Sequence, residues 1–132
     1  MIGQGSMGEV FFARDNELLR DVAFKRLKRA ETDSEPHQKA LLREARIAAQ
    51  LDHPNIVPIH RLQRGEAGEL GYVMKLIQGE SLTQLLARAA QHKTHGRLSE
   101  DERQIERLEV LLKVVDAVAY AHEKGVIHRD LK

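Results

Sequence analysis

The sequence predicts an α+β fold, in which an antiparallel β-sheet with one packed helix comes first and helices follow. Up to about residue 77, short stretches that alternate between apolar and polar residues are separated by glycine-containing turns, a pattern typical of paired strands. One stretch in this part has the 3.6-residue apolar spacing of a helix. After Gly79 the pattern is helical. We therefore expect two parts, residues 1–77 and residues 78–132.

Strands and turns can be placed along the first part. The stretch after the first glycines carries a valine and two phenylalanines and runs into a turn of Asp, Asn and Glu, as expected of a strand that returns as a hairpin. The predicted strands span residues 8–14, 21–28, 56–62 and 72–77, with turns at 15–17 and 65–71 and a polar loop at 31–36.

Residues 37–51 are predicted to form the helix that packs on this sheet. Their apolar positions are spaced as one helical face. Pro54 ends the helix, because the residue before a proline is pushed out of the helical region. The apolar face consists of Leu41, Ala45, Ala48 and Leu51.

Glu44 lies in the middle of that apolar face. A carboxylate there is partly desolvated, and a buried charge without a partner is costly, so the position requires a cation. Lys25, on a predicted strand, is the simplest candidate, and we expect its amine within about 4 Å of a Glu44 oxygen. The alternative is a tilted helix on which Glu44 reaches solvent.

Two helices are predicted in the second part. Ser81 and Ser99 each open the Ser-x-x-Gln/Glu pattern of a capping box, which marks a helix start. A polar loop at 92–97 separates the helices, and the second ends near Gly125. We expect its apolar stripe to be core in a complete domain and to lack much of its packing partner in these residues. The stripe consists of Ile105, Leu108, Leu112, Val115 and Ala119.

Composition narrows the classes of partner. Of 132 residues 42% are hydrophobic, enough for a globular core, and 21 Lys and Arg against 20 Asp and Glu leave a net charge of +1. This balance indicates neither nucleic acid nor a membrane surface as a partner, and an aromatic content of 4% argues against stacking on single-stranded nucleic acid. The chain has no cysteine, no signal pattern and no apolar run of membrane-spanning length. We therefore expect a cytoplasmic protein.

A glycine-rich loop opens the chain, with glycines at positions 3, 5 and 8 followed by Val10 in a Gly-x-Gly-x-x-Gly-x-Val pattern. Glycine allows a tight turn and lets backbone N–H groups approach phosphate oxygens without a Cβ in the way. A flexible hairpin explains the same residues about equally well. Because the pattern runs into a strand and not into a helix, it is not a dinucleotide-binding fingerprint.

Lys25 follows in a Val-Ala-Phe-Lys stretch on the second predicted strand. Alternate residues of a strand share a face, so Ala23 and Lys25 place a small residue beside an amine on a surface that suits a nucleotide. Taken alone, the basic run at 25–29 is more simply a solvated edge or a localisation patch.

The most specific pattern is His-Arg-Asp-Leu-Lys at residues 128–132. At average amino-acid frequencies it arises by chance in about 4 of 100,000 chains of this length. It also follows a long amphipathic helix and a glycine. By contrast, His92 and His95 lie in a polar loop with no further ligand at metal-binding spacing, so we expect no metal site there.

In this order and spacing, the motifs resemble the eukaryotic-like protein kinases, most closely those of the bacterial serine/threonine type. The resemblance includes His-Pro-Asn-Ile-Val at 53–57 and covers the whole chain. It implies a protein kinase-like fold, in which residues 1–77 are the N-lobe, with the glycine-rich loop, the ATP-binding sheet and the Glu-bearing helix. Residues 78–132 are then the end of the hinge and a partial helical C-lobe that ends in the catalytic loop.

The resemblance also implies roles in transfer of the γ-phosphate of ATP to protein hydroxyls with Mg²⁺. Asp130 would be the catalytic base and Lys132 would lie near the transferred phosphoryl group. Lys25, held by Glu44, would pair with the α- and β-phosphates. Gly3, Gly5 and Gly8 would cover the phosphates, and the apolar roof over adenine would consist of Ile2, Val10 and Ala23. Met74 would be the gatekeeper at the back of the adenine pocket, and hinge backbone groups of Lys75 and Ile77 would hydrogen-bond adenine.

The chain departs from the family pattern at its ends and at position 75. Most members have an acidic residue at that position, but a backbone contact does not depend on the side chain. The metal-binding asparagine and the Asp-Phe-Gly segment that would follow Lys132 do not occur in these residues, so we expect the 132-residue chain alone to be inactive. The alternative function is a truncated, non-catalytic kinase-like module that at most binds nucleotide or a protein partner.

Overall fold

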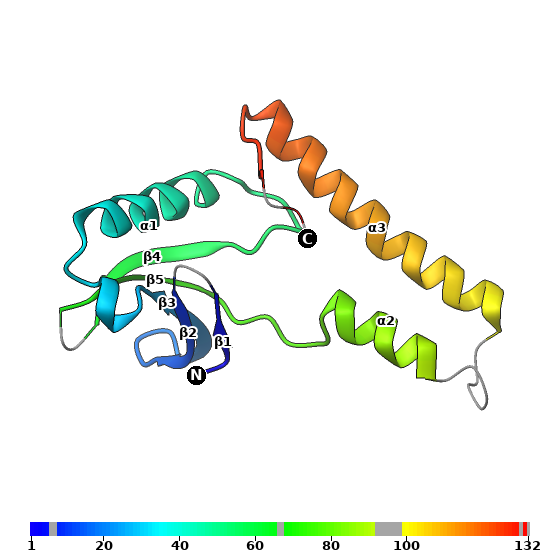
Figure 1. The fold of residues 1–132 in the computed structure, drawn as a ribbon, viewed down its shortest axis with the longest axis horizontal. Coiled ribbons are helices and arrows are strands. Elements are labelled where there is room, and N and C mark those ends of the chain that lie inside the picture. The colour runs from blue at the N-terminus through cyan, green and yellow to red at the C-terminus, as the bar shows by residue number, and fades with distance from the viewer. Residues whose placement is uncertain (6–7, 66–67, 92–98, 130, 132) are drawn as a thin grey trace. The chain divides into compact units, whose positions relative to one another are not determined.

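The chain divides into two compact units, unit 1 (Met1–Ile77) and unit 2 (Gln78–Lys132), shown in Figure 1. The structure is a computed structural model that describes residues 1–5, 8–65, 68–91, 99–129 and 131. Unit 1 contains a β-sheet and one α-helix, and unit 2 is helical. The helices are the 3₁₀ helix η1 (Arg29–Glu31), α1 (Glu35–Ala48), α2 (Leu82–Gln91) and α3 (Glu100–Glu123).

Unit 1 is built on a five-stranded antiparallel sheet with the strand order β1-β2-β3-β5-β4. Neighbours in the sequence, β2 with β3 and β4 with β5, pair as antiparallel strands, while β3 also pairs with β5. The sequence prediction of an antiparallel sheet is therefore confirmed. The strands are β1 (Gly3–Gln4), β2 (Glu9–Asp15), β3 (Arg20–Arg26), β4 (Ile59–Arg64) and β5 (Leu70–Lys75).

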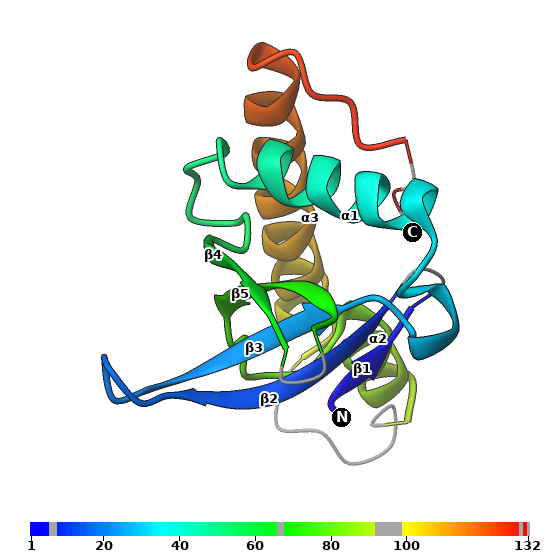
Figure 2. The same ribbon diagram turned by 90° about the vertical axis from the view of Figure 1, so that its left-hand side faces the viewer.

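The register assigns each strand residue to one face of the sheet. Lys25 of β3 lies directly opposite Val10 of β2 and Tyr72 of β5, and directly opposed residues point to the same side. Phe24, the neighbour of Lys25, therefore points to the other side. We call the side of Lys25 the helix face, because α1 packs there over β4 and β5 (Figures 1 and 2), and the side of Phe24 the outer face.

The core of unit 1 lies between α1 and the helix face. One buried cluster consists of Leu27, which directly follows β3, Leu41 and Ala45 of α1, and Tyr72 of β5. Leu41 and Ala45 are each 2% exposed, so the centre of the predicted apolar helix face is confirmed. Three partly buried side chains complete the cluster, namely Ile59, Leu70 and Met74.

Helix α1 is shifted toward the N-terminus relative to its predicted range of 37–51. It begins at Glu35, so Glu35 and Pro36 belong to the helix and not to the predicted loop. Proline is compatible with the first turn because an N–H has no intrahelical partner there. The helix ends at Ala48, since the next residues form tighter turns, and Leu51 lies outside it, partly buried.

Strand boundaries also differ from the prediction, although β2 and β3 agree with it to within two residues. β4 begins at Ile59 and not at residue 56, because the N–H of Ile56 bonds within a turn and Pro58 has no N–H to give to a ladder. β5 already includes Gly71, which pairs with Arg26, so the predicted turn at 65–71 was too long. Apolar alternation does not reveal which residues find a partner across the sheet.

Both helices of unit 2 begin at capping boxes, as predicted. Ser99 donates its N–H to Glu102 Oε2 at 2.7 Å, and its Oγ accepts the Glu102 N–H at 3.2 Å. Ser81 and Gln84 make the same two bonds at the start of α2. α3 ends just before Gly125, whose φ of 76° is the left-handed conformation that commonly terminates helices.

The apolar stripe of α3 is exposed. Among the described residues of unit 2, Leu85 and Ala121 are the buried hydrophobic ones. The predicted lack of a packing partner is thus confirmed for the part of the chain that is described. None of the described helices is both long enough and apolar enough to span a membrane. The stripe residues Ile105, Leu108, Leu112 and Val115 are between 56% and 67% exposed.

Candidate functional site

Lys25 and Glu44 form an ion pair on the helix face of unit 1. Lys25 Nζ from β3 lies 2.5 Å from Glu44 Oε1 from α1, and the side chains are 21% and 36% exposed. The predicted pairing is therefore confirmed. The alternative of a tilted helix is right only in that the Glu44 side chain keeps some contact with solvent.

Tyr72 is a third member of this group, which sequence reasoning missed. Its Oη donates to Glu44 Oε1 at 2.7 Å, and Lys25 Nζ lies 5.6 Å from the centre of its ring. Burial of Tyr72, then its hydrogen bond to Glu44 and the charge of that carboxylate, raise the pKa of the phenol far above its ordinary value. The phenol therefore stays protonated and acts as a donor. The sequence placed Tyr72 on the strand predicted at 72–77. It did not contain the register that brings this strand beside Lys25.

Three of the apolar residues predicted around Lys25, namely Val10, Ala23 and Met74, lie on its face of the sheet. Ala23, 2% exposed, is directly opposite Met74, and Val10 is directly opposite Lys25. Ile2 donates its N–H to the Val10 carbonyl at 2.8 Å, so it lies beside the same strand. The sheet thus gathers residues that are far apart in the sequence around one lysine.

The three glycines of the loop differ in their surroundings. A Cβ on Gly8 would lie 2.6 Å from the carbonyl oxygen of Arg26, so the pairing of β2 with β3 itself requires glycine there. At Gly3 and Gly5 the nearest described atoms would be 3.8 and 4.0 Å away, which leaves room for a Cβ. Packing among the described residues therefore explains Gly8 but not the other two.

Lys75 is the last residue of β5, and Ile77 lies two residues further along the chain. The N–H of Lys75 donates to the Pro58 carbonyl at 3.1 Å. A ligand bond at Lys75 would therefore use its carbonyl. The side chains of both residues are exposed, so neither contributes to the core of unit 1.

The motif at residues 128–132 is described only in part, because Asp130 and Lys132 lie outside the described residues. Arg129 has a φ of 62°, in the left-handed region that few residues other than glycine adopt. Such conformations cluster at functional sites. The backbone of the motif is therefore unusual where the sequence pattern is most specific.

Within the described ranges, His, Cys, Asp and Glu residues form no group of three or more that could hold a metal ion. His92 and His95, for which the sequence predicted no metal site, lie outside those ranges.

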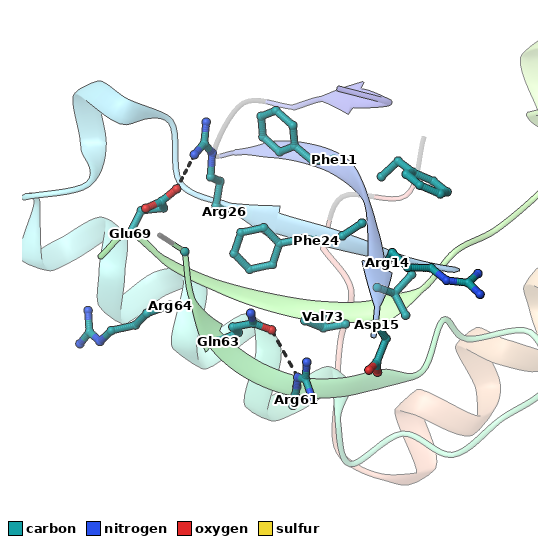
Figure 3. A pocket seen from close by; sticks show the side chains of 14 residues that line it. Phe11, Arg14, Asp15, Phe24, Arg26, Arg61, Gln63, Arg64, Glu69 and Val73 are labelled. Atoms are coloured by element: carbon teal, nitrogen blue, oxygen red, sulfur yellow. Dashed lines mark hydrogen bonds and ion pairs between the residues drawn. The ribbon is translucent and has the colours of Figure 1, made fainter. Parts of the chain in front are cut away.

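A cavity of about 690 Å³ opens on the outer face of the sheet, away from Lys25 (Figure 3). Phe11 and Phe24 line it, and the guanidinium carbon of Arg26 lies 4.5 Å from the centre of the Phe11 ring. Arg26 also forms an ion pair with Glu69, so its charge is compensated. Three further arginines, Arg14, Arg61 and Arg64, also line the cavity, together with Asp15, so its lining combines apolar side chains with charges of both signs.

Comparison with known proteins agrees with the motifs. Residues 1–132 match the family model described as the protein kinase domain. The chain is 40% identical over 134 residues to the serine/threonine-protein kinase PknD of Chlamydia trachomatis serovar L2b, and 35% identical over 133 residues to that of Protochlamydia amoebophila. These matches cover 100% and 99% of this chain but only 14% and 13% of the two relatives.

A solved structure with the same fold is the Mycobacterium tuberculosis PknI kinase domain. It superposes with a TM-score of 0.69 at 29% sequence identity, over 100% of this chain and 50% of that one. The fold that the resemblance implied is therefore confirmed.

Proposed function

The chain belongs to the serine/threonine protein kinase family and matches 50% of a solved kinase domain, and on this basis we propose that it supplies the ATP-binding part of an active kinase. The reaction is transfer of the γ-phosphate of ATP to a hydroxyl group of a protein substrate. The observation that carries the proposal is the Lys25–Glu44 ion pair at 2.5 Å, on the face that also holds Ala23.

Lys25 binds the α- and β-phosphates in this proposal. The Glu44 carboxylate holds its ammonium group in place, so less side-chain freedom is lost when phosphate oxygens arrive. Gly3 and Gly5 support the same assignment. The described packing leaves room for a Cβ at both positions and so does not require glycine there. A loop that covers phosphates does require it, because its backbone must approach the phosphates closely.

Adenine binds against the apolar residues of the same face. Ile2, Val10 and Ala23 form its roof, and Met74 stands at its back. The carbonyl of Lys75 and a backbone group of Ile77 bond its polar edge. The Lys75 contact uses the carbonyl because Pro58 already accepts the N–H of that residue.

Asp130 is the proposed base that orients the substrate hydroxyl and accepts its proton as the new P–O bond forms, and Lys132 is placed near the transferred group. Magnesium, when bound in kinases, neutralises charge on the β- and γ-phosphates. The described residues contain no group of three or more His, Cys, Asp or Glu side chains that could hold this metal.

Phosphoryl transfer by a kinase domain that contains residues 1–132 tests this proposal. Lys25→Met and Asp130→Asn should each lower the rate by about 100-fold or more, while Asp130→Asn leaves ATP binding largely intact. Lys28→Met is the matched control, because it makes the same chemical change three residues away on a side chain with no proposed role. Radiolabelled ATP with a protein acceptor measures the rates, and isothermal titration measures ATP binding.

Transfer by Lys25→Met at the unsubstituted rate would overturn the assignment of the site. If the domain binds ATP but transfers no phosphate, the proposal is wrong and the chain is part of a non-catalytic nucleotide-binding module.

A further inference from the structure

The hydroxyl group of Tyr72 completes a three-residue cluster that the reaction as proposed above does not use. Two donors meet at one atom, because Glu44 Oε1 accepts from Lys25 Nζ at 2.5 Å and from Tyr72 Oη at 2.7 Å. The ammonium group also lies 5.6 Å from the centre of the tyrosine ring, within reach of a cation–π attraction. Each member of the cluster therefore contacts the other two.

The three side chains differ in how firmly they are held. Lys25 and Glu44 are 21% and 36% exposed, and partly exposed ion pairs between long side chains contribute little and separate easily. Tyr72 is 4% exposed and packs in the core cluster with Leu41 and Ala45 of α1. Its ring is fixed by packing, so its hydroxyl is a donor with little freedom to leave.

The position of Tyr72 on β5 ties helix α1 to the sheet at a second point. Lys25 reaches Glu44 from β3, and Tyr72 reaches it from the neighbouring strand. Without the phenol, the carboxylate would depend on the flexible lysine alone. A hydrogen bond to a charged acceptor is stronger than one between neutral groups. The bond from Tyr72 is therefore strong enough to favour one orientation of the Glu44 side chain.

We propose that Tyr72 is a positioning residue that holds Glu44 against Lys25 before nucleotide arrives, so that the ion pair is assembled in the empty site. The inference rests on the proposed function, in which Lys25 aligns the phosphates. Because Tyr72 is 4% exposed and its hydroxyl bonds Glu44, we assign it no contact with ATP or the acceptor, and it acts on the reaction only through Glu44.

Steady-state kinetics of a kinase domain containing residues 1–132 separates positioning from mere packing. Tyr72→Phe keeps the ring and removes only the hydroxyl, and we expect it to lower kcat about fivefold. The KM for ATP should stay within about twofold, because binding contacts are retained. In a Glu44→Gln background, Tyr72→Phe should cause no further loss, because the residue acts through that carboxylate.

Tyr120→Phe is the matched control, since it makes the same change at the other tyrosine of the chain, in α3. It should leave kcat unchanged. Equal losses from Tyr72→Phe in both backgrounds, or no loss in either, would overturn the inference. If Lys25→Met abolishes transfer while Tyr72→Phe is neutral, only the role of Tyr72 fails; if Lys25→Met is neutral, the proposed function fails.

A second measurement does not depend on activity. The ammonium group of Lys25 in the 132-residue chain can be observed by ¹⁵N NMR, where a held ammonium gives a slowly exchanging signal. Tyr72→Phe should speed that exchange by about fivefold, whereas Tyr120→Phe should not change it. An unchanged Lys25 signal in Tyr72→Phe would show that the lysine alone holds Glu44, and the inference would be wrong.

Discussion

Unit 1 buries the apolar face of its amphipathic helix α1, whereas the apolar stripe of α3 in unit 2 is exposed in the part of the chain that the structure describes. Leu41 of α1 is 2% exposed against the sheet, whereas Leu112 of α3 is 67% exposed. Both faces were visible as periodic apolar residues in the sequence. The difference shows that periodicity identifies the face that favours burial, while a neighbouring layer decides whether it is buried. In unit 1 the sheet within the same 77 residues is that layer.

The largest expected effect comes from truncating a leucine in each helix. Leu41→Ala should lower the free energy of unfolding of unit 1 by about 2–5 kcal/mol, because it removes buried contacts and leaves a cavity. Leu112→Ala should change the stability of unit 2 by less than about 0.5 kcal/mol, since its side chain is mostly in solvent already. Urea unfolding, with hydrogen exchange read separately for α1 and α3, measures both. Similar losses at the two positions would contradict the contrast between the units.

A smaller effect is expected on self-association. The exposed stripe of α3 should make the chain bind apolar dyes and associate, and replacing Leu108 and Leu112 by Gln should remove roughly half of the dye fluorescence. The matched control is Leu18→Gln in the turn between β2 and β3, where one exposed leucine lies outside any helical stripe. Dye titration and sedimentation measure the outcome. A monomeric chain without dye binding would show that the stripe is covered in solution.

The smallest expected effect is a difference in pH response. His60 lies at a register shift of β4, where partial desolvation, and then the charge of Arg20, lower its pKa below the ordinary 6.5. The folded state therefore binds this proton less readily than the unfolded state. The part of the stability of unit 1 that depends on neutral His60 is therefore fully present above pH 6.5, and it is lost as the pH falls through the folded pKa of this residue.

The capping carboxylate of α3 responds at lower pH. Its hydrogen bond from the backbone N–H of Ser99 lowers the pKa of Glu102 below 4.5, so its contribution is lost only as the pH falls below that value. Unit 1 should thus begin to weaken at higher pH than the start of α3. His60→Gln should remove the loss in unit 1, measured by exchange of β4 and β5 amides at about pH 7.5 and 5.5, with His122→Gln in α3 as the control. A loss that persists in His60→Gln would assign it to other groups.

Much of the candidate site could be predicted from local patterns. Glycine spacing, the Val-Ala-Phe-Lys stretch and a carboxylate inside an apolar helix face were enough to predict the Lys25–Glu44 pair, because an uncompensated charge at such a position is costly. The capping boxes of unit 2 were equally readable, since both bonds of each box join residues three apart.

Other features depended on partners distant in the sequence. Tyr72 reaches Glu44 only through the pairing of β3 with β5, and a change of register by one residue would turn it to the outer face. The start of β4 at Ile59 likewise follows from which backbone groups meet across the sheet.

The sequence by itself thus determined the order of the four longer strands and of α1, α2 and α3, the starts of the two helices of unit 2, and the two charges that meet on the helix face. Each of these depends on residues a few positions apart or on the cost of one unpaired charge. Only the tertiary structure decided the register that adds Tyr72 to the pair, the requirement for glycine at Gly8, and the exposure of the α3 stripe. These three depend on which surfaces come together in space, and a one-dimensional pattern does not contain that information.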